Sequence, residues 1–464
     1  MSEPKKPTCA GCVAKDAEIA RRTAQRAAAG KNSTNSSKPP SSDIVKPDQL
    51  PPVPDGQEKR SIGGQPGHQA HFRDLFDELQ IDEVVPHTLC GCPHCGGELR
   101  RNGDLVHRFQ QVDVVLPNLT VTEHQCPDYW CEACGRSCQA DLPEAVRRGG
   151  LAGPMLTTLV AYLKGCCHAS FSTIRLFLRD VCGLKVARGT LAKIIDRVSA
   201  SLAGSYEELE KLLPEQDLLN VDETGHKENG KLLWTWCLKA NLFTLFKIAP
   251  SRGSGVLIDV LGREFDGVIG CDYFSAYRKF MRVLGIEVQF CLAHLIRDVK
   301  FLCALPDVRE QAYGIALALE LRKLFGVIHR REQMSAAEWC RELDSAKASI
   351  LAVAQQAPAT PAAQVLAKRF ATHGESYFTF ITTPGMEPTN NAAERAIRFV
   401  VLDRHVTQGT RGAKGRRWCE RIWTVLATCR QREISPFVFL REAIAHWLDG
   451  NDSPSLLDGA FAPA

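Results

Sequence analysis

The sequence lacks any apolar run approaching the roughly 20 residues that a membrane-spanning helix needs. Its first residues, MSEPKKPTCAGC, also lack the apolar stretch of a secretory signal. These two absences argue against a membrane partner and predict a cytoplasmic location. The formal net charge of the 464-residue chain is only +4, which is too small to indicate a nucleic-acid partner by itself.

Cysteine, in contrast, is abundant. The chain has 19 cysteines, and a disulfide framework is a poor interpretation for a long chain without an export signal. Two CxxC pairs, each followed by glycine, are formed by Cys92 with Cys95 and by Cys131 with Cys134. Each pair predicts a tight turn that aims two thiolates at one tetrahedral ion, so we expect a structural zinc site, with buried or redox-active thiols as the alternative. The segment between the pairs, including LTVTEHQ, alternates like a β-hairpin.

Three acidic residues lie where a metal-dependent site would need them. Asp222 ends the apolar run LLNV and Asp272 ends the run VIGC, and both runs predict buried strands. Glu394 lies near the start of a helix that is expected to follow the cap signal Thr389-Asn390-Asn391. Two strand-end aspartates and a helix glutamate can converge on one small volume, where clustered carboxylate oxygens bind hard divalent cations.

The pattern around the two aspartates predicts an α/β domain. LLNVDE, KLLWTWCLKA and FTLFKIAP predict three consecutive strands, followed by a helix, a strand over GVIGCDYF, a helix, and a strand that runs into a helix over EVQFCLAHLIRDVKFL. This order matches the ribonuclease H arrangement, in which acidic residues on the first and fourth strands face one another and a later helix adds the third.

The whole chain is therefore predicted to be a multidomain α/β protein. Apolar residues at helical spacing over 150–212 indicate helices that fit either a helix-turn-helix domain or a generic bundle. The predicted segments are a flexible N-terminal region with a Ser/Pro linker (1–60), a zinc-ribbon-like module (61–145), a helical DNA-binding domain (150–212), a ribonuclease H-like catalytic domain (214–400) with a helical insertion at about 300–385, and a C-terminal basic and helical tail (401–464).

Basic residues cluster around and after Glu394. Most charge runs form a solvated surface, and that interpretation is the alternative here. The position of the cluster beside the carboxylates favours contact with a phosphate backbone. The residues expected to contact DNA are Arg395, Arg398, Arg411, Lys414, Arg416 and Arg417.

Taken in order, several segments resemble the IS66-type insertion-sequence transposases across nearly the whole chain. They are KNSTNSSKPPSSD, GGQPGHQ, CPHCG, CEACG, VDETG, CDYFSAY, FCLAHLIRD and EPTNNAAERAIR. The resemblance implies a DDE triad of Asp222, Asp272 and Glu394 on a ribonuclease H-like fold. Cys291 and His294 match the CxxH element that many DDE transposases carry after the second aspartate, and are candidate accessory residues.

The resulting hypothesis is a DDE transposase that binds insertion-sequence ends and catalyses DNA strand cleavage and strand transfer. Two Mg²⁺ or Mn²⁺ ions would activate water, and later a DNA 3′-hydroxyl, for in-line attack on phosphorus. Asp222 would bridge both ions, while Asp272 and Glu394 would hold one each. Glu223 is a rival for Asp222, because adjacent side chains on a strand point to opposite faces, and the resemblance favours Asp222.

Two other functions stay open. One is a structure-specific nuclease of the same fold, which hydrolyses DNA without rejoining it. The other is a catalytically inactive, zinc-dependent DNA-binding protein. The expected partners are double-stranded DNA, as terminal inverted repeats and target DNA, further copies of this chain on that DNA, and small accessory proteins encoded nearby. The expected location is the cytoplasm, in association with the nucleoid.

Overall fold

The computed structural model describes residues 77–85, 94–95, 110, 119–134 and 136–458. Contacts divide the chain into two compact units, one within Pro51–Val121 and the other from Thr122 onward. The predicted N-terminal region of residues 1–60 lies outside the described residues. Within the described part, no helix is both long and apolar enough to cross a membrane.

A short antiparallel hairpin surrounds the second cysteine pair. Its strands are β1 (Asp128–Cys131) and β2 (Arg136–Gln139), with Cys131 opposite Arg136. The alternating segment LTVTEHQ, residues 119–125, forms no strand, so the predicted position of this hairpin strand was wrong. Leu119 and Val121 are exposed, and alternation without a packed face is not enough to form a sheet.

A five-stranded mixed sheet forms the centre of the larger unit. The strand order is β5-β4-β3-β6-β7, with antiparallel pairing of β3 to β4 and β4 to β5, and parallel pairing of β3 to β6 and β6 to β7. The strands are β3 (Leu218–Glu228), β4 (Lys231–Lys239), β5 (Thr244–Ala249), β6 (Val268–Cys271) and β7 (Val288–Phe290). All five lie where the apolar runs of the sequence predict them.

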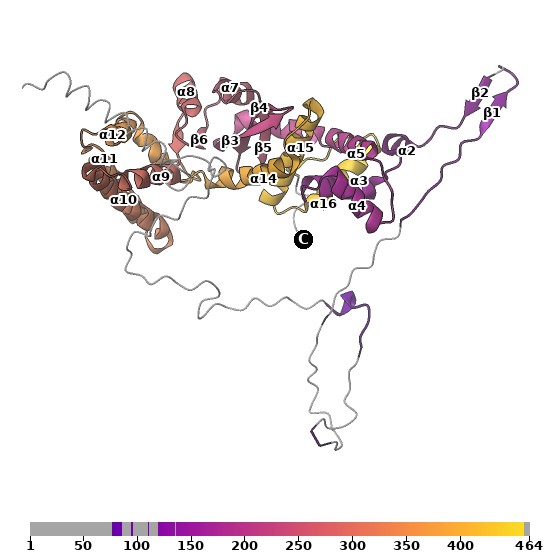
Figure 1. The fold of residues 1–464 in the computed structure, drawn as a ribbon, viewed down its shortest axis with the longest axis horizontal. Coiled ribbons are helices and arrows are strands. Elements are labelled where there is room, and N and C mark those ends of the chain that lie inside the picture. The colour runs from indigo at the N-terminus through magenta and orange to yellow at the C-terminus, as the bar shows by residue number, and fades with distance from the viewer. Residues whose placement is uncertain (1–76, 86–93, 96–109, 111–118, 135, 459–464) are drawn as a thin grey trace, which may run out of the picture. The chain divides into compact units, whose positions relative to one another are not determined.

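Helices extend this unit at both ends of the sheet (Figure 1). The predicted helical insertion between β7 and the Glu394 helix contains three long helices that pack together. The predicted break, at QQAPAT, separates the second of these helices from the third. The helices that follow β5 in the sequence are α7 (Gly255–Leu261), α8 (Ser275–Leu284), α9 (Leu292–Cys303), α10 (Val308–His329), α11 (Ala336–Ala354) and α12 (Pro361–His373). They are followed by the 3-10 turn η5 (Glu375–Tyr377) and the short helix α13 (Thr379–Thr382).

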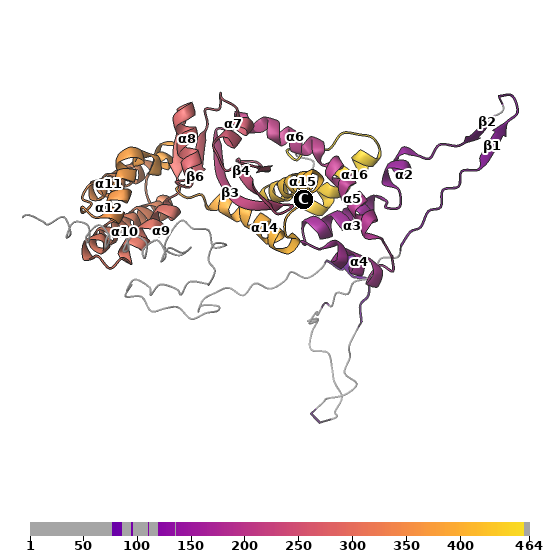
Figure 2. The ribbon, with the colours of Figure 1, turned by 45° about the horizontal axis from the view of Figure 1, so that its top comes forward.

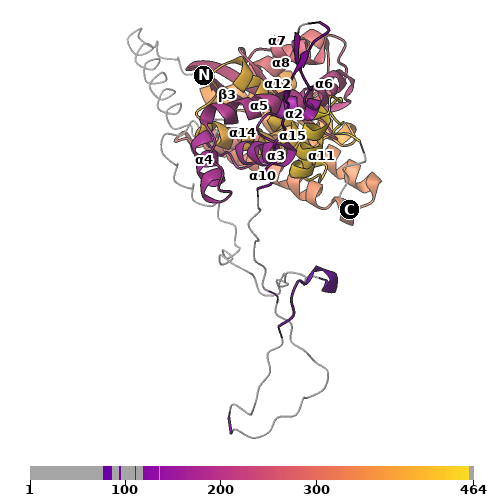
Figure 3. The same ribbon diagram turned by 90° about the vertical axis from the view of Figure 1, so that its right-hand side faces the viewer.

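The helices before the sheet pack with those at the C-terminal end, as the view of Figure 2 also shows. The preceding helices are α2 (Glu144–Gly149), α3 (Pro154–Gly165), α4 (Phe171–Asp180), α5 (Arg188–Ser201) and α6 (Ala203–Leu212). The later ones are α14 (Asn391–Thr407), α15 (Ala413–Gln431) and α16 (Pro436–Leu448). The segment predicted as a C-terminal tail therefore contributes α15, which contacts β5, and α16, which contacts α3. Figure 3 shows α15 near α3 and α5, which it also contacts.

Helix α15 contacts β5 through polar side chains spaced one helical turn apart. Ile248 N–H donates to Glu420 Oε1 at 2.7 Å, and Phe246 N–H donates to Thr424 Oγ1 at 2.9 Å. Thr244 N–H donates to Thr428 Oγ1 at 3.2 Å. Three backbone donors of β5 that β4 does not use are therefore satisfied by α15.

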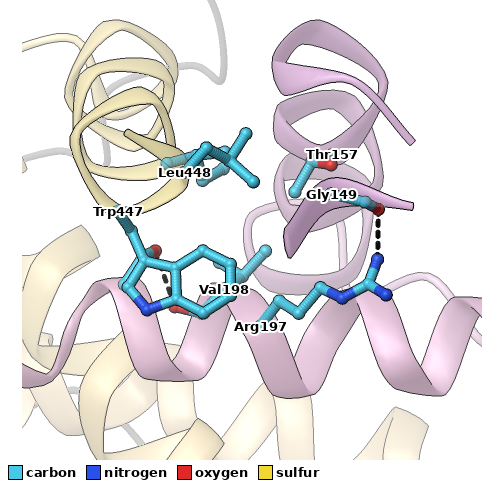
Figure 4. Close-up of a pocket in the computed structure, with 8 residues that line it drawn as sticks. Gly149, Thr157, Arg197, Val198, Trp447 and Leu448 are labelled. Carbon is cyan, nitrogen blue, oxygen red and sulfur yellow. Dashed lines mark hydrogen bonds between the residues drawn. The ribbon is translucent and has the colours of Figure 1, made fainter. Parts of the chain in front are cut away.

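A small cavity lies among α3, α5 and α16 (Figure 4). Its volume is about 10 Å³, and Thr157, Val198 and Leu448 are among its lining residues. Arg197 NH1 donates to the carbonyl oxygen of Gly149 beside it. A cavity of this size has room for about one water molecule, so the helical region offers no ligand site here.

Candidate catalytic and metal-binding site

The parallel pairing of β3, β6 and β7 brings chemically active residues to one level, in the middle of β3 and just after the ends of β6 and β7. Asn220 pairs with Gly270, and Gly270 pairs with Gln289. Asp222, Asp272 and Cys291 each come two residues after one of these three paired residues. Because parallel strands keep their register, all three side chains emerge together at the edge where α/β sheets bind ligands.

Helix α14 covers the face of β3 that carries Asp222. On a strand, alternate residues share a face, so Asn220, Asp222 and Thr224 point the same way. Asn220 Nδ2 donates to Asn390 Oδ1 at 3.1 Å, and Arg404 NH1 donates to Thr224 Oγ1 at 3.1 Å. Asp222 therefore lies between two contacts with the helix that carries Glu394 in its first turn.

Asn390 ties the start of α14 to the strand ends. Its Nδ2 donates to the Val221 carbonyl at 2.8 Å, and its backbone N–H donates to Cys291 Sγ at 3.1 Å. The sequence predicted a helix start here, and α14 does begin at Asn391, but Asn390 makes no side-chain cap bond. Its side chain bonds to β3 instead.

Gly270 leaves room for this connection. A Cβ atom at Gly270 would lie 2.5 Å from Asn220 Nδ2, which is closer than real contacts allow. The glycine of VIGC therefore lets the Asn220 side chain pass over β6 toward Asn390.

The carboxyl groups at this edge raise one another's pKa. Burial raises the pKa of Asp222 well above its usual value, and the charges of Glu223, Asp272 and Glu394 raise it further. Burial and the charge of Glu223 raise the pKa of Asp272 to about 7, against the lowering effect of the Phe274 N–H and Arg252. Buried carboxylates that repel one another favour a bound proton or a bound cation.

Glu223, the rival of Asp222, points to the buried face of β3 and is fully paired there. Arg252 NH2 lies 2.6 Å from Glu223 Oε1, and the Tyr277 hydroxyl donates to Glu223 Oε2. The guanidinium of Arg252 also lies over the ring of Phe274, 3.9 Å from its centroid. This pairing leaves Asp222 as the β3 carboxylate on the α14 side.

Glu394 is closest to residues of α9. His294 Nδ1 lies 3.4 Å from Glu394 Oε1, and Arg297 NH2 lies 3.5 Å from Glu394 Oε2. Throughout the described ranges, one group of three candidate metal ligands has all its ligand atoms within 4.8 Å of one another, and it consists of Cys291, His294 and Glu394. The three predicted triad carboxylates do not form such a group, so at least one pair of them is farther apart.

The basic residues predicted to contact DNA lie in or near α14 and α15. Lys414 forms an ion pair with Asp196 at 3.0 Å, and Arg416 lies 3.5 Å from Glu228. The other four are exposed, namely Arg395, Arg398, Arg411 and Arg417.

The zinc ligands are only partly within the described residues. Cys95 and Cys134 are exposed, and Cys131 ends β1. Cys92 lies outside the described residues.

Sequence reasoning missed several residues that organise this site. Asn390, Arg252 and Arg297 all act through contacts with residues remote in the chain or on another element. Arg297 carried a local signal, because it lies one helical turn after His294 and so shares its face of α9.

Comparison with known proteins identifies relatives of both parts of the chain. The model of the transposase IS66 family matches residues 149–417, which contain every residue of the site just described. The model of the zinc-finger binding domain of transposase IS66 matches residues 90–135, which contain all four predicted zinc ligands and support a structural zinc ion. The uncharacterised protein y4hP of Sinorhizobium fredii is 23% identical over 419 residues, covering 80% of this chain and 73% of that protein.

Proposed function

The chain belongs to the IS66 family of transposases, and from this premise we propose that it cleaves and joins DNA at insertion-sequence ends with Asp222, Asp272 and Glu394 as its catalytic carboxylates. The domain that carries them is proposed to be ribonuclease H-like. The supporting observation is the common level of Asp222 and Asp272, each two residues after a paired residue of parallel strands, together with the packing on β3 of the helix that carries Glu394.

The donor set fits Mg²⁺ or Mn²⁺, because its ligand atoms are all carboxylate oxygens and its two aspartates have raised pKa values. Bound to the three carboxylates, such ions would neutralise the charge on the scissile phosphate and lower the pKa of the attacking hydroxyl. The role of the three side chains would be to converge on the bound ions. Asn390 supports this convergence, since it fixes the start of α14 against β3.

DNA would be bound by the exposed basic residues beside this edge. Arg395 and Arg398 follow Glu394 on α14, so a phosphate held by them would lie next to the carboxylates. Helices α3 to α6 remain a candidate DNA-binding domain. An assembly of several copies on paired element ends, helped by accessory proteins, belongs to the same proposal.

The test compares Asp222→Asn with Asp217→Asn in the full-length protein. Asp217 is an exposed aspartate just before β3, so the control makes the same chemical change outside the site. With labelled element ends, a target plasmid and Mg²⁺, we expect Asp222→Asn to abolish cleavage and joining and to retain DNA binding, while Asp217→Asn behaves as wild type.

Normal joining by Asp222→Asn would reject the assignment of this triad. Cleavage without joining by the wild-type protein would identify a nuclease of the same site. DNA binding without either reaction would favour an inactive DNA-binding protein.

A further inference from the structure

A group of potential metal ligands that includes sulfur and nitrogen lies next to the three proposed catalytic carboxylates. Cys291 directly precedes α9, His294 lies in its first turn, and Glu394 lies in the first turn of α14. We propose that these three residues bind a transition-metal ion of the zinc class, at a site that shares Glu394 with the triad. Thiolate, imidazole and carboxylate together suit zinc-class ions, whereas Mg²⁺ prefers oxygen ligands.

The spacing of the donors fits such an ion. His294 Nδ1 and Glu394 Oε1 are 3.4 Å apart. Two ligands of a tetrahedral zinc ion, with bonds about 2.0–2.2 Å long, are separated by about 3.4 Å. A charge-assisted hydrogen bond would be shorter, at about 2.7–2.9 Å. Both atoms are buried and have no hydrogen-bond partner in the described structure. A bound cation would supply the missing partner for both of them.

The sulfur of Cys291 has backbone donors that oppose the rise in its thiol pKa caused by burial. It is buried and accepts a hydrogen bond from the backbone N–H of Asn390 at 3.1 Å. The backbone N–H groups of Ala293 and His294, at the start of α9, also interact with it. Such donors stabilise negative charge on sulfur, and a zinc-class ion binds the thiolate rather than the thiol.

Arg297 sets a condition for binding. Its NH1 donates to His294 Nε2 at 3.3 Å, so Nε2 accepts in the structure. Coordination through Nδ1 leaves the imidazole proton on Nε2, which then becomes a donor. Arg297 must therefore turn NH1 away when the ion binds, and its partly exposed side chain has room to do so while it stays near Glu394 Oε2.

The consequence for catalysis rests on the function proposed above. An ion at this site would take Glu394 Oε1 away from the ions of the triad. Zinc would thereby inhibit Mg²⁺-dependent DNA cleavage, and a chelator specific for zinc would reverse the inhibition.

The first experiment measures zinc per chain in full-length protein after exposure to zinc and gel filtration. We expect Cys291→Ser to hold one ion fewer than wild type, and Cys340→Ser, which alters an exposed cysteine, to hold the wild-type number. With cobalt in place of zinc, the difference spectrum between wild type and Cys291→Ser should contain a thiolate-to-cobalt charge-transfer band. Equal metal content in wild type and Cys291→Ser would overturn the proposal.

A second variant covers the case in which Cys291→Ser fails to fold. Arg297→Gln removes the guanidinium that competes with the ion, so its zinc affinity at this site should rise several-fold. Unchanged or weaker affinity would mean that Arg297 and His294 only hold Glu394 by hydrogen bonds, and would overturn the proposal.

Cleavage assays separate this site from the catalytic function. Zinc should inhibit wild type more strongly than Cys291→Ser. If the wild-type protein cleaves no DNA but Cys291→Ser still holds one ion fewer than wild type, the metal site is supported and the proposed function is rejected.

Discussion

Buried or half-buried carboxylates occur in two regions of this protein, and their surroundings differ. Glu420 on α15 is buried, and its Oε1 accepts a hydrogen bond from the backbone of β5. In the middle of β3 and at the end of β6, Asp222 and Asp272 are surrounded by further acidic groups, and Glu394 Oε1 has no hydrogen-bond partner. Asp222 and Asp272 each accept one backbone N–H, from Glu223 and Phe274. The two regions therefore differ in the neighbouring negative charge and in the unpartnered oxygen of Glu394, which are features expected of a functional site.

The largest contrast should come from the same amide substitution in both regions. Glu394→Gln removes a proposed metal ligand and should slow cleavage of labelled element ends about a thousandfold or more, because metal-ion catalysis supplies several kcal/mol. Glu420→Gln keeps an acceptor oxygen for Ile248 N–H and should cleave at the wild-type rate. Equal losses in the two variants would remove the distinction between the regions.

Asn390→Ala should lower both the free energy of unfolding and the affinity for Mn²⁺. It removes the hydrogen bonds to Val221 and Asn220 and leaves a buried carbonyl without its donor, which costs about 2–3 kcal/mol in the free energy of unfolding. It should also weaken Mn²⁺ binding, since Glu394 is no longer held over the strand ends. Denaturant unfolding and Mn²⁺ titration measure the two effects, with exposed Asn391→Ala as the control. Unaltered Mn²⁺ affinity in Asn390→Ala would contradict the positioning role.

Thr424→Val should affect stability alone. It leaves the Phe246 N–H buried without an acceptor, at a cost of about 1–2 kcal/mol, while Thr424→Ser keeps the hydroxyl and should unfold near the wild-type midpoint. Mn²⁺ affinity should be the same in all three proteins. A change in Mn²⁺ affinity would show that α15 also shapes the metal-binding edge.

The smallest expected difference between the regions is a dependence of Mn²⁺ affinity on pH. Because the pKa of Asp272 is raised to about 7, a proton must leave before an ion binds, and affinity should rise at least about tenfold per pH unit below pH 7. Asp222, whose pKa is also raised, should add to this slope. Burial, Glu223 and Glu394 raise this pKa, while Phe274 N–H and Arg252 lower it.

The same group should make the metal-free protein less stable as pH rises. Its folded pKa lies above the value of about 3.9 for an unfolded aspartate, so the folded chain binds more protons between about pH 4 and pH 7. Stability without metal should fall across that window, and Mg²⁺ should oppose the loss. Asp272→Asn should show a smaller pH slope in calorimetric unfolding, and the slope that remains belongs to Asp222, whose pKa is also raised. An unchanged slope in Asp272→Asn would contradict the contribution of Asp272.

The strands and the helix start of the site could be predicted from local sequence. LLNV and VIGC are short apolar runs that each end in aspartate, and β3 and β6 form over these runs. The segment TNNAAER indicated the start of α14 within one residue. These features depend on neighbouring residues only.

Contacts between distant segments could not be predicted in this way. The role of Asn390 depends on Val221, 169 residues earlier in the chain, and local sequence suggested a cap instead. The acceptors Glu420, Thr424 and Thr428 are spaced four residues apart, but polar positions at that spacing usually indicate a solvated helix face. Only the packing of α15 on β5 turns them into partners of a strand.

That packing also limits how copies of this protein can associate. Exposed sheet borders are templates on which strands of another chain can pair. One border, β5, has its free N–H groups occupied by α15, and the other, β7, is three residues long and bonded through Gln289 to Tyr377 and Phe380. The five-stranded sheet is therefore protected against aggregation by strand addition, and copies of this chain could not associate by extending it.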